Sequence, residues 1–312
     1  MTDIVTLTVN PAIDVSTMVD RIVPVRKLRC TAQLRYPGGG GINVARVIKR
    51  LGGDAIAVYP VGATNGALLQ QLVAREGVGS HTWRIAAETR EDFFITETSS
   101  GQPYRFILPG SSLDPTEWQE GLDVIAGLNP FPRFVVASGS LPSGVPHDFY
   151  VRVGRIAKQR GARMVLDTSG PPLAMAVAEG LDMIKPNLRE MGELIGHQPA
   201  DAAQWAEAAR ELVQEGKVGV VALTMAHLGA ALVARDLTLR ARPVSIVPLS
   251  ATGAGDSFLG ALIWRLAAGH DLTDAFRHAT AAGAAALLNR GTELCRPNDV
   301  ERLAAQTIVE SL

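Results

Sequence analysis

The strongest constraint on the fold is a regular alternation of two residue patterns along most of the chain. Short runs rich in β-branched residues are each followed by a longer segment with helical periodicity. We predict strands at 55–60, 133–137, 163–167 and 183–185, and helices at 66–76, 147–160, 172–179 and 189–195. Strands that alternate with helices form a mostly parallel sheet with right-handed crossovers and helices on its faces, which defines the α/β class.

The remaining segments extend this prediction to both ends of the chain. The other expected strands are 4–9, 218–224, 244–248 and an antiparallel edge hairpin of 230–234 and 237–240. The other expected helices are 42–51, 201–215, 257–267, 275–289 and 299–309. Hydrophobic residues make up 47% of the chain and aromatic residues only 5%. Such a core of Ala, Val, Leu and Ile suits helices packed on a parallel sheet.

Two segments lack this alternation and predict a small accessory sheet. Residues 15–36 contain irregularly spaced β-branched residues, and 92–98 and 104–108 form a second strand pair around a turn at 99–102. We therefore expect a single α/β domain over 1–312, with a discontinuous β lid at about 15–36 and 90–109. A four-stranded sheet with one bare apolar face is rarely left in water, so a homodimer through the lid is expected.

Composition excludes several classes of protein. The net charge is −1, so there is no basic excess to bind nucleic acid, and no apolar run is long enough to cross a membrane. The chain starts directly with a strand pattern and not with a secretory signal. Cys30 and Cys295 are far apart, and the six histidines form no metal-binding or catalytic spacing. A reducing, cytoplasmic location is expected.

Residues 37–46 (PGGGGINVAR) are the first unusual motif. Four glycines that run straight into a helix indicate a backbone that closely approaches another group, and they are not typical of a flexible linker. The spacing matches neither a Walker A loop nor a dinucleotide fingerprint. Asn43, one turn into the helix, is placed to hydrogen-bond a ligand hydroxyl.

Residues 250–261 (SATGAGDSFLGA) are the second motif, at a junction of loop and helix. Unpaired backbone amides and the positive end of the helix dipole favour an anion there, above all a phosphate. A carboxylate beside such a site would repel the ligand unless it takes a proton from an attacking hydroxyl. Asp256 is therefore a candidate general base, and the alternative is a first-turn acidic residue favoured by the helix dipole.

Further candidates follow the expected strands, where ligands gather in open α/β sheets. Asp14 is either a sugar-hydroxyl acceptor or a turn-forming residue. The segments 138–142 and 167–170 also follow strand ends. Asn187 and Glu190, three residues apart at a helix start, suit a hydrated Mg²⁺, and they equally suit a helix-capping pair.

Taken together, the glycine block, the Asn187–Glu190 pair and residues 251–261 resemble the two signatures and the magnesium motif of the ribokinase-like (PfkB-type) sugar kinases. The resemblance covers essentially the whole chain. Within the family, the segments 27–32, 38–46, 104–106, 108–110 and 138–142 are similar to those of its bacterial 6-phosphofructokinase branch.

The resemblance implies a reaction and a set of site residues. Asp256 would activate O1 of fructose 6-phosphate for attack on the γ-phosphate of ATP, and backbone amides of Thr252, Gly253, Ala254 and Gly255 would form an anion hole. The sugar hydroxyls would be held by Asp14, Gly39 and Asn43. The existing phosphate would be held by Ser140, Arg90 and Arg105, assisted by Lys27 and Arg29, some of them acting in a partner's site.

The resemblance also implies positions for the nucleotide and for two metal ions. The residues bordering ATP would be Lys185, Asn187, Thr224, Gly229, Thr252 and Asn289. Asn187 and Glu190 would reach Mg²⁺ through water. A potassium ion would lie near Ser250, Thr252, Ala286, Asn289 and Gly291.

One departure from the family pattern falls in the nucleotide loop, residues 224–229 (TMAHLG). Ala226 stands where a glycine is usual, and His227 where a proline is frequent. If the backbone at Ala226 has a positive φ, alanine costs roughly 1 kcal/mol relative to glycine. The nucleotide affinity is the property this change would alter.

Two alternatives remain open at the level of sequence. The first is a 1-phosphofructokinase or a tagatose-6-phosphate kinase, although such relatives commonly carry lysine where this chain has Gly40. The second is a non-catalytic sugar or nucleotide sensor on the kinase fold, against which the intact Asp256, Gly253 and Gly255 argue. Arg90 and Arg105 favour a phosphorylated substrate, because a free sugar needs no cationic clamp.

Overall fold

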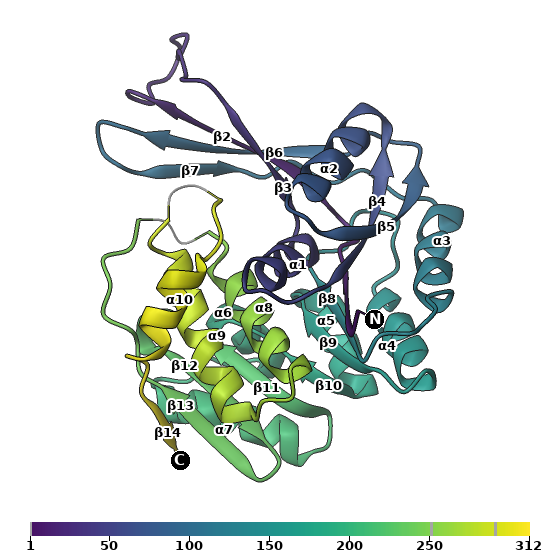
Figure 1. Cartoon of the computed structure of the whole chain (residues 1–312), viewed down its shortest axis with the longest axis vertical. Coiled ribbons are helices and arrows are strands. Elements are labelled where there is room, and N and C mark those ends of the chain that lie inside the picture. The colour runs from purple at the N-terminus through teal and green to yellow at the C-terminus, as the bar shows by residue number, and fades with distance from the viewer. Residues whose placement is uncertain (1, 250–251, 290–291) are drawn as a thin grey trace.

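A computed structural model describes residues 2–249, 252–289 and 292–312. Within them, a large sheet forms the centre of the molecule, and a small sheet lies above it (Figure 1). The large sheet contains, in spatial order, β14 (Val309–Ser311), β13 (Leu237–Ala241), β12 (Ala230–Ala234), β11 (Val218–Thr224), β10 (Leu181–Ile184), β9 (Arg163–Asp167), β8 (Phe134–Ser138), β1 (Ile4–Leu7), β4 (Ile56–Gly62) and β5 (Gly79–Ile85). The strands from β11 to β5 are parallel, and β12, β13 and β14 are antiparallel. The predicted α/β class with a mostly parallel sheet is confirmed.

Helices cover both faces of this sheet. One face packs against α3 (Pro115–Ala126), α4 (Phe149–Gln159), α5 (Gly170–Glu179), α6 (Leu188–Ile195) and α7 (Ala202–Gln214). The other face packs against α1 (Gly40–Arg50), α2 (Ala63–Arg75), α8 (Ala254–Ala267) and α9 (Leu272–Ala286), and α10 (Pro297–Ala304) packs outside them. A single 3₁₀ turn, η1 (Ala226–Leu228), follows β11. No described helix is long and apolar enough to cross a membrane.

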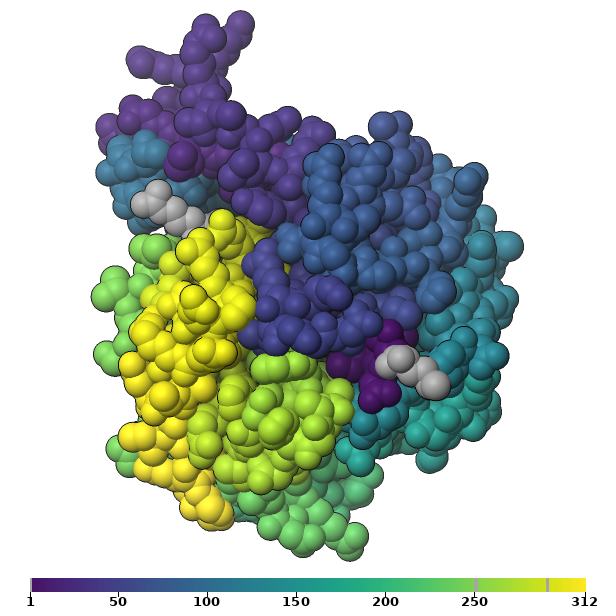
Figure 2. All heavy atoms as spheres, in the orientation of Figure 1, coloured from purple at the N-terminus to yellow at the C-terminus, as the bar shows by residue number. Residues whose placement is uncertain are grey.

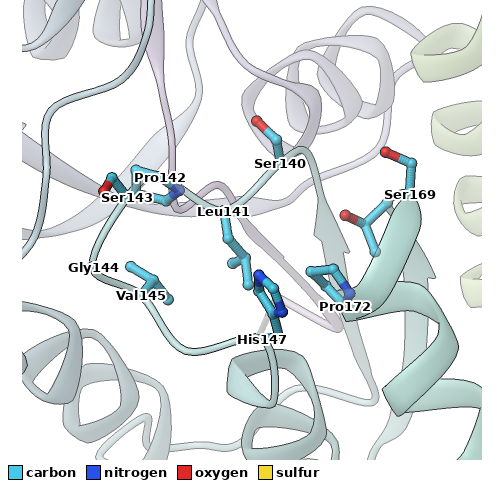
Figure 3. Close-up of a pocket in the computed structure, with 10 residues that line it drawn as sticks. Ser140, Leu141, Pro142, Ser143, Gly144, Val145, His147, Ser169 and Pro172 are labelled. Carbon is cyan, nitrogen blue, oxygen red and sulfur yellow. The ribbon is translucent and has the colours of Figure 1, made fainter.

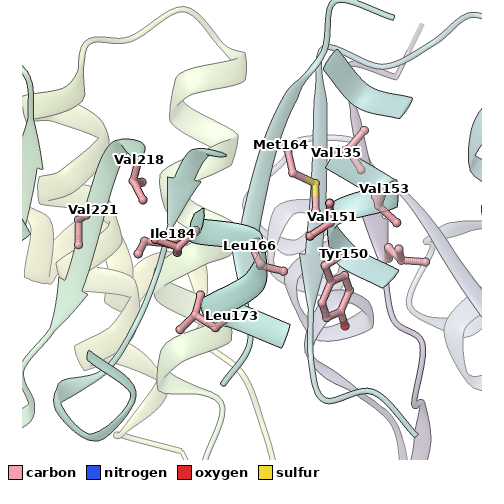
Figure 4. Packing of buried hydrophobic residues seen from close by; sticks show 14 of the residues in the cluster. Val135, Tyr150, Val151, Val153, Met164, Leu166, Leu173, Ile184, Val218 and Val221 are labelled. Carbon is pink, nitrogen blue, oxygen red and sulfur yellow. The ribbon is translucent and has the colours of Figure 1, made fainter. Parts of the chain in front are cut away.

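The strands are apolar on both sides because each side is covered by helices. In β8, Val135 and Ala137 pack toward α3 and α4, whereas Phe134 and Val136 pack toward the opposite helices. Figure 4 shows the first of these clusters, in which side chains from neighbouring parallel strands meet Tyr150 and Val153 of α4. This two-sided burial fixes the carboxyl ends of the strands, where the candidate site lies.

The small sheet confirms the accessory sheet predicted from the sequence. Its strands, in spatial order, are β3 (Leu34–Gly38), β2 (Ala12–Val19), β6 (Arg90–Glu97) and β7 (Pro103–Phe106). The segment between β2 and β3 stands clear of the rest of the molecule (Figure 2). Since β2 leads into the site from one side and β3 leads directly into α1, this sheet adjoins the candidate site.

Several predicted elements are corrected by the structure. Residues 244–248 form no strand, because the free edge of β13 pairs instead with β14. The last helix was predicted over 299–309, but it ends at Ala304. Residues 309–311 instead form β14, which pairs with β13. Residues 20–33 are mostly irregular and do not continue the two lid strands. Both α3 and β5 were missed, and β5 begins with the polar run Gly79–His81, which hides its pattern.

Candidate active site

The glycine block presses the start of α1 onto the strand ends. A Cβ on Gly38 would lie 2.2 Å from Asp14 Oδ1, and one on Gly40 would lie 2.2 Å from Ser138 Oγ. Gly39 has a φ of 112°, which favours glycine, and a Cβ there would meet Thr8 at 2.6 Å. The expected close approach is therefore real, and it brings α1 against the chain's own β-strands.

Asp256 lies in the first turn of α8 and does not cap its own helix. Its Oδ2 accepts a hydrogen bond of 2.9 Å from Asn43 Nδ2, which joins the two unusual motifs across 213 residues. The preceding Gly253 has a left-handed φ of 77° and ends the loop at the N-cap, ahead of Ala254 and Gly255. Asp256 as a residue is partly exposed, and it lies in the first turn of α8, where the helix dipole is positive.

Burial, and after it the charge of Asp167, together raise the pKa of Asp256 to about 6. The hydrogen bond from Asn43 and the charges of Lys185 and Arg46 act in the opposite direction. A carboxylate with a pKa near neutrality is a better proton acceptor than an ordinary aspartate, and it remains mostly ionised at pH 7. The arrangement therefore suits general base catalysis.

A buried ion pair lies beside Asp256. Lys185 Nζ is 3.1 Å from Asp167 Oδ1, with the two side chains 4% and 14% exposed. Ser138 donates to the other carboxylate oxygen of Asp167 at 3.3 Å. A Cβ on Gly255 would lie 3.4 Å from Lys185 Nζ, so the ammonium group faces the start of α8. Its positive charge is therefore fixed beside the first turn of α8.

Asp14 is buried in the small sheet, since it lies in β2 and is 6% exposed. Burial, and then the charge of Asp92, raise the pKa of Asp14 to about 7, while Arg46 and Arg90 lower it and Asp256 raises it. Asp92 is its direct partner in the register of β2 and β6. Asp14 is therefore close enough to Asp256 for their charges to interact, and the carboxylate of Asp92, to which the sequence analysis gave no role, lies next to it.

The four predicted phosphate-binding cations fall into two groups. Arg90 and Arg105 lie on the same face of the small sheet as Asp14, because Asp14 pairs with Asp92 and Phe94 pairs with Arg105. Arg90 donates to the carbonyls of Leu108 (2.8 Å) and Asn10 (3.2 Å), whereas Arg105 lies over the ring of Phe94. Lys27 and Arg29 are exposed in the loop between β2 and β3 and are not brought to the site.

Ser140, just past the end of β8, accepts a hydrogen bond of 3.3 Å from Asn10 Nδ2. It borders a cavity of about 400 Å³ between the loop that follows β8 and the start of α5 (Figure 3). Besides Ser140, hydroxyl groups of Ser143, Thr168 and Ser169 line this cavity. Ser140 is thus at the same edge of the sheet as Asp167.

The predicted nucleotide-binding residues lie at the neighbouring strand ends. Thr224 at the end of β11 forms a bridge with Asn187, and its hydroxyl lies 3.4 Å from the carbonyl of Pro186. Gly229 has a φ of 90° and accepts from the Met225 amide at 2.8 Å, which closes the loop. Ala226 has a positive φ of 49°, which is the backbone conformation in which alanine is less favourable than glycine.

Asn187 and Glu190 form a complete capping box at the start of α6. The Glu190 amide donates to Asn187 Oδ1 and the Asn187 amide donates to Glu190 Oε2, each at 3.0 Å. The capping alternative is therefore realised. Both oxygens keep lone pairs that can accept from a water molecule, so the pair fits a hydrated Mg²⁺. Among the described residues, no three His, Cys, Asp or Glu side chains are grouped to hold a metal.

The predicted potassium ligands are described only in part, because Ser250 and Gly291 lie outside the described residues. Asn289 is 4% exposed and donates to the carbonyls of Ala285 and Leu294. Ala286 is buried in the last turn of α9, and Thr252 is partly exposed just before α8.

The sequence of this chain matches a known protein family over most of its length. Residues 4–299 match the model of the pfkB family carbohydrate kinases. The chain belongs to the PfkB family. It is 41% identical to the ATP-dependent 6-phosphofructokinase isozyme 2 of Mycobacterium tuberculosis over 96% of this chain and 88% of that protein. It is 33% identical to a 1-phosphofructokinase of Xanthomonas campestris, over 98% of this chain and 97% of that protein.

A solved structure agrees with this membership. The phosphofructokinase-2 of Escherichia coli, crystallised in complex with potassium, superposes with a TM-score of 0.94 at 36% identity, over 98% of this chain and 99% of that one. This PfkB-family chain is therefore a phosphotransferase with the ribokinase-like fold that its motifs led us to expect.

Sequence analysis assigned no role to three charged residues at the site of this PfkB kinase. The only feature of the sequence that pointed to Asp167 was its position as a polar residue at the end of an expected strand. Its ion-pair partner Lys185 also lies at the end of an expected strand. Arg46 is fully buried within the glycine block motif and binds Glu76, the C-cap residue of α2, at 2.8 Å. Nothing in the sequence near Glu76 indicates this contact, because the two side chains are 30 residues apart.

Proposed function

We propose that this chain transfers the γ-phosphoryl group of ATP to O1 of fructose 6-phosphate, with Asp256 as the general base. The observation that carries the proposal is the position of Asp256. A carboxylate with a pKa of about 6, on a partly exposed residue, lies in the first turn of a helix and near a buried lysine. A phosphoryl-transfer site needs a proton acceptor and fixed positive charge together.

In the proposed reaction, Asp256 accepts the proton of the O1 hydroxyl. O1 then forms a bond to the γ-phosphorus as the bond to the β,γ-bridging oxygen breaks, and ADP leaves. The amides of Thr252, Gly253, Ala254 and Gly255 face the charge that develops on the phosphoryl oxygens. Lys185, buried and paired with Asp167, adds a fixed positive charge on the same side.

The proposed sugar site combines hydroxyl acceptors and cations. Asp14, Asn43 and the backbone at Gly39 hold the sugar, and Ser140, Arg90 and Arg105 face its phosphate. Asp14, Arg90 and Arg105 share one face of the small sheet, which supports this assignment. In this proposal the guanidinium of Arg90 exchanges a carbonyl partner for a phosphate oxygen when substrate binds.

The proposed nucleotide site is bordered by Lys185, Asn187, Thr224, Gly229, Thr252 and Asn289. Mg²⁺, when bound, would neutralise charge on the ATP phosphates, and Asn187 and Glu190 would hold its water molecules. A potassium ion near Thr252, Ala286 and Asn289, with Ser250 and Gly291, is part of the same proposal, and the potassium complex of the E. coli relative supports it.

We also propose that the small sheet is a lid belonging to a single domain, and that two lids meet in a homodimer. Met18 and Leu34 are 39% and 58% exposed on the face that carries Asp14, beyond the site itself. Exposed apolar groups on a sheet face favour a protein partner. In such a dimer, Lys27 and Arg29 act in the partner's site.

A 1-phosphofructokinase is the second candidate, because a relative with that name is 33% identical over nearly the whole chain. Tagatose 6-phosphate is a further possible substrate. Gly40 favours the main proposal, since a Cβ at this position would lie 2.2 Å from Ser138 Oγ and a lysine would require the site to rearrange.

Steady-state kinetics with ATP and a panel of acceptors test the proposal. The panel contains fructose 6-phosphate, fructose 1-phosphate, tagatose 6-phosphate and unphosphorylated fructose. We expect the highest kcat/KM for fructose 6-phosphate. A highest value for fructose 1-phosphate would establish the second candidate, and a highest value for the free sugar would overturn the phosphate clamp. Binding of sugar and ATP without turnover would establish a sensor.

A further inference from the structure

A chain of hydrogen bonds runs from the surface of α2 to the candidate base. Glu76 Oε1 accepts from Arg46 Nη2 at 2.8 Å, and Arg46 Nη1 donates to Asn43 Oδ1 at 2.9 Å. Asn43 Nδ2 then donates to Asp256 Oδ2 at 2.9 Å. The four residues come from three elements, namely the C-terminal end of α2, α1 and α8.

We propose that Arg46, anchored by Glu76, is a positioning residue that locks the Asn43 amide in the orientation that donates a hydrogen bond to the ionised Asp256. This inference rests on the proposed function, because it assigns a role within the same catalytic site. It adds two residues that do not touch the substrate to the machinery that prepares the base.

The chemistry of the four groups determines the orientation of the amide. An arginine can only donate hydrogen bonds, so the Asn43 atom that faces it is the oxygen. The nitrogen of the same amide must then face Asp256, and an ionised carboxylate can only accept. If the amide were reversed, its oxygen would face Asp256, and only a protonated carboxyl could donate to it. The orientation fixed by Arg46 therefore favours the proton-accepting form of the base.

Arg46 is built into the fold in a way that suits this role. Its side chain is fully buried, and it lies one helical turn after Asn43, so that both project from one face of α1. It also donates to the Pro37 carbonyl at 3.0 Å, which ties it to the glycine block. A buried guanidinium needs a partner, and Glu76 supplies the carboxylate.

Other charged groups also act on Asp256 and must stay constant in a test. They are Asp167 at the end of β9, Lys185 after β10, and Asp14 in β2. None of them contacts Arg46 through a hydrogen bond among the described residues. The charge of Arg46 itself, however, also lowers the pKa of Asp256 and of Asp14, so a test must separate this charge from the orientation of the amide.

Arg50 provides a matched control. It lies one turn beyond Arg46 on α1 and binds the same carboxylate, with Nη2 3.1 Å from Glu76 Oε2. No hydrogen bond links it to Asn43 in the described part of the chain. Arg50→Met therefore removes an ion pair with Glu76 and leaves the Asn43 amide under the control of Arg46.

The test compares the wild type with Arg46→Met, Glu76→Gln and Arg50→Met. For Arg46→Met we expect the acidic limb of the kcat–pH profile to move up by about one pH unit. At pH 7 we expect kcat to fall roughly 10- to 100-fold, with the KM for ATP unchanged. Glu76→Gln should show the same changes to a smaller degree, and it serves if Arg46→Met does not fold. Arg50→Met should keep the wild-type kcat and profile.

A second readout does not depend on turnover. The pKa of Asp256, followed by carbon NMR of labelled aspartate, should rise in Arg46→Met and stay constant in Arg50→Met. It should also rise in Arg46→Lys, which keeps the positive charge and removes the guanidinium fork that holds both Asn43 and Glu76, and a wild-type pKa in Arg46→Lys would show that Arg46 acts through its charge alone. A wild-type Asp256 pKa in folded Arg46→Met, or equal shifts in both arginine variants, would overturn the inference. If the wild type phosphorylated no sugar phosphate, the proposed function would fail, and the NMR measurement would still decide the role of Arg46.

Discussion

The Lys185 ammonium lies 3.1 Å from the Asp167 carboxylate, and together they form the buried charge pair nearest to the candidate base. This relationship explains how the site tolerates its charges. The carboxylates of Asp14, Asp167 and Asp256 share a small volume with the cations of Lys185 and Arg46. Each cation is held by a carboxylate or an amide oxygen, so the site carries positive charge at fixed positions.

Removing one member of this pair should destabilise the fold. For Asp167→Ala we expect a loss of about 3 kcal/mol in the free energy of unfolding, because Lys185 becomes an unpaired buried charge. Asp3→Ala is the control, since Asp3 pairs with Arg133 on the surface, where a salt bridge contributes less than about 1 kcal/mol. Urea unfolding at pH 7 measures both. Equal losses in the two variants would contradict the account of the buried pair.

The raised pKa of Asp14 predicts a stability that depends on pH. An ordinary aspartate has a pKa of 3.8, whereas Asp14 in the folded chain has a pKa of about 7 because it is buried and lies near Asp92. The folded state therefore keeps a proton that the unfolded chain has released between these two values. The contribution of Asp14 to stability is highest below pH 3.8, falls as the pH rises toward 7, and is fully lost above that.

Asp14→Asn removes this penalty, so it should stabilise the protein at pH 8 by about 1–3 kcal/mol and have no such effect near pH 4. Urea unfolding at pH 4, 6 and 8 measures the difference from wild type. Asp236→Asn, in an exposed turn, should change stability by less than about 0.5 kcal/mol throughout. An Asp14→Asn protein that is less stable than wild type at pH 8 would refute the assigned charge environment.

Much of this site could be anticipated from the chain alone. The bounds of β9 and β11 were predicted to the residue, because each is a short β-branched run between turn residues. Asn43 and Asp256 were singled out by the motifs that contain them. The couplings of Arg46 with Glu76 and of Asp14 with Asp92 were not visible, since they depend on which helix and strand ends meet in space. The error at 244–248 has the same origin, because strand propensity does not reveal that β14 occupies the edge.

The nucleotide loop predicts a gain from restoring glycine. Ala226 has a φ of 49°, a conformation that costs an alanine roughly 1 kcal/mol. We expect Ala226→Gly to raise the free energy of unfolding by about 0.5–1 kcal/mol and to lower the KM for ATP a few-fold, by about 5-fold at most.

Ala63 is the control for this change, because its φ is 48° and it begins α2, outside the nucleotide loop. Ala63→Gly should give a similar gain in stability with no change in the KM for ATP. Thermal unfolding and initial rates over a range of ATP concentrations measure the two properties. If Ala226→Gly lost stability while Ala63→Gly gained it, strain at Ala226 would not be the relevant property of the loop.

A charge placed on the exposed face of the small sheet should weaken the proposed homodimer. Leu34 is 58% exposed on the face of the small sheet that carries Asp14. In the proposed homodimer Leu34 would lie at the interface, so we expect Leu34→Glu to shift the chain toward monomer, because a buried unpaired carboxylate there is strongly unfavourable. The KM for fructose 6-phosphate should rise with it, since Lys27 and Arg29 would no longer reach a partner's site.

Sedimentation velocity measures the assembly, with Met175→Glu as the control. Met175 is 44% exposed on α5, away from the lid, so its replacement should leave the dimer intact. A wild-type chain that is already monomeric at micromolar concentration would reject the lid as a dimer interface.

Transfer of the O1 proton to Asp256 is tested most directly by the turnover of Asp256→Asn. Asparagine has the same shape as aspartate and keeps an oxygen for the Asn43 amide, but it cannot accept the proton of O1. We predict that kcat with fructose 6-phosphate and ATP falls about 10²- to 10⁴-fold while sugar-phosphate binding, measured by calorimetry, stays within a few-fold of wild type. A folded Asp256→Asn protein with a kcat close to that of wild type would contradict the account.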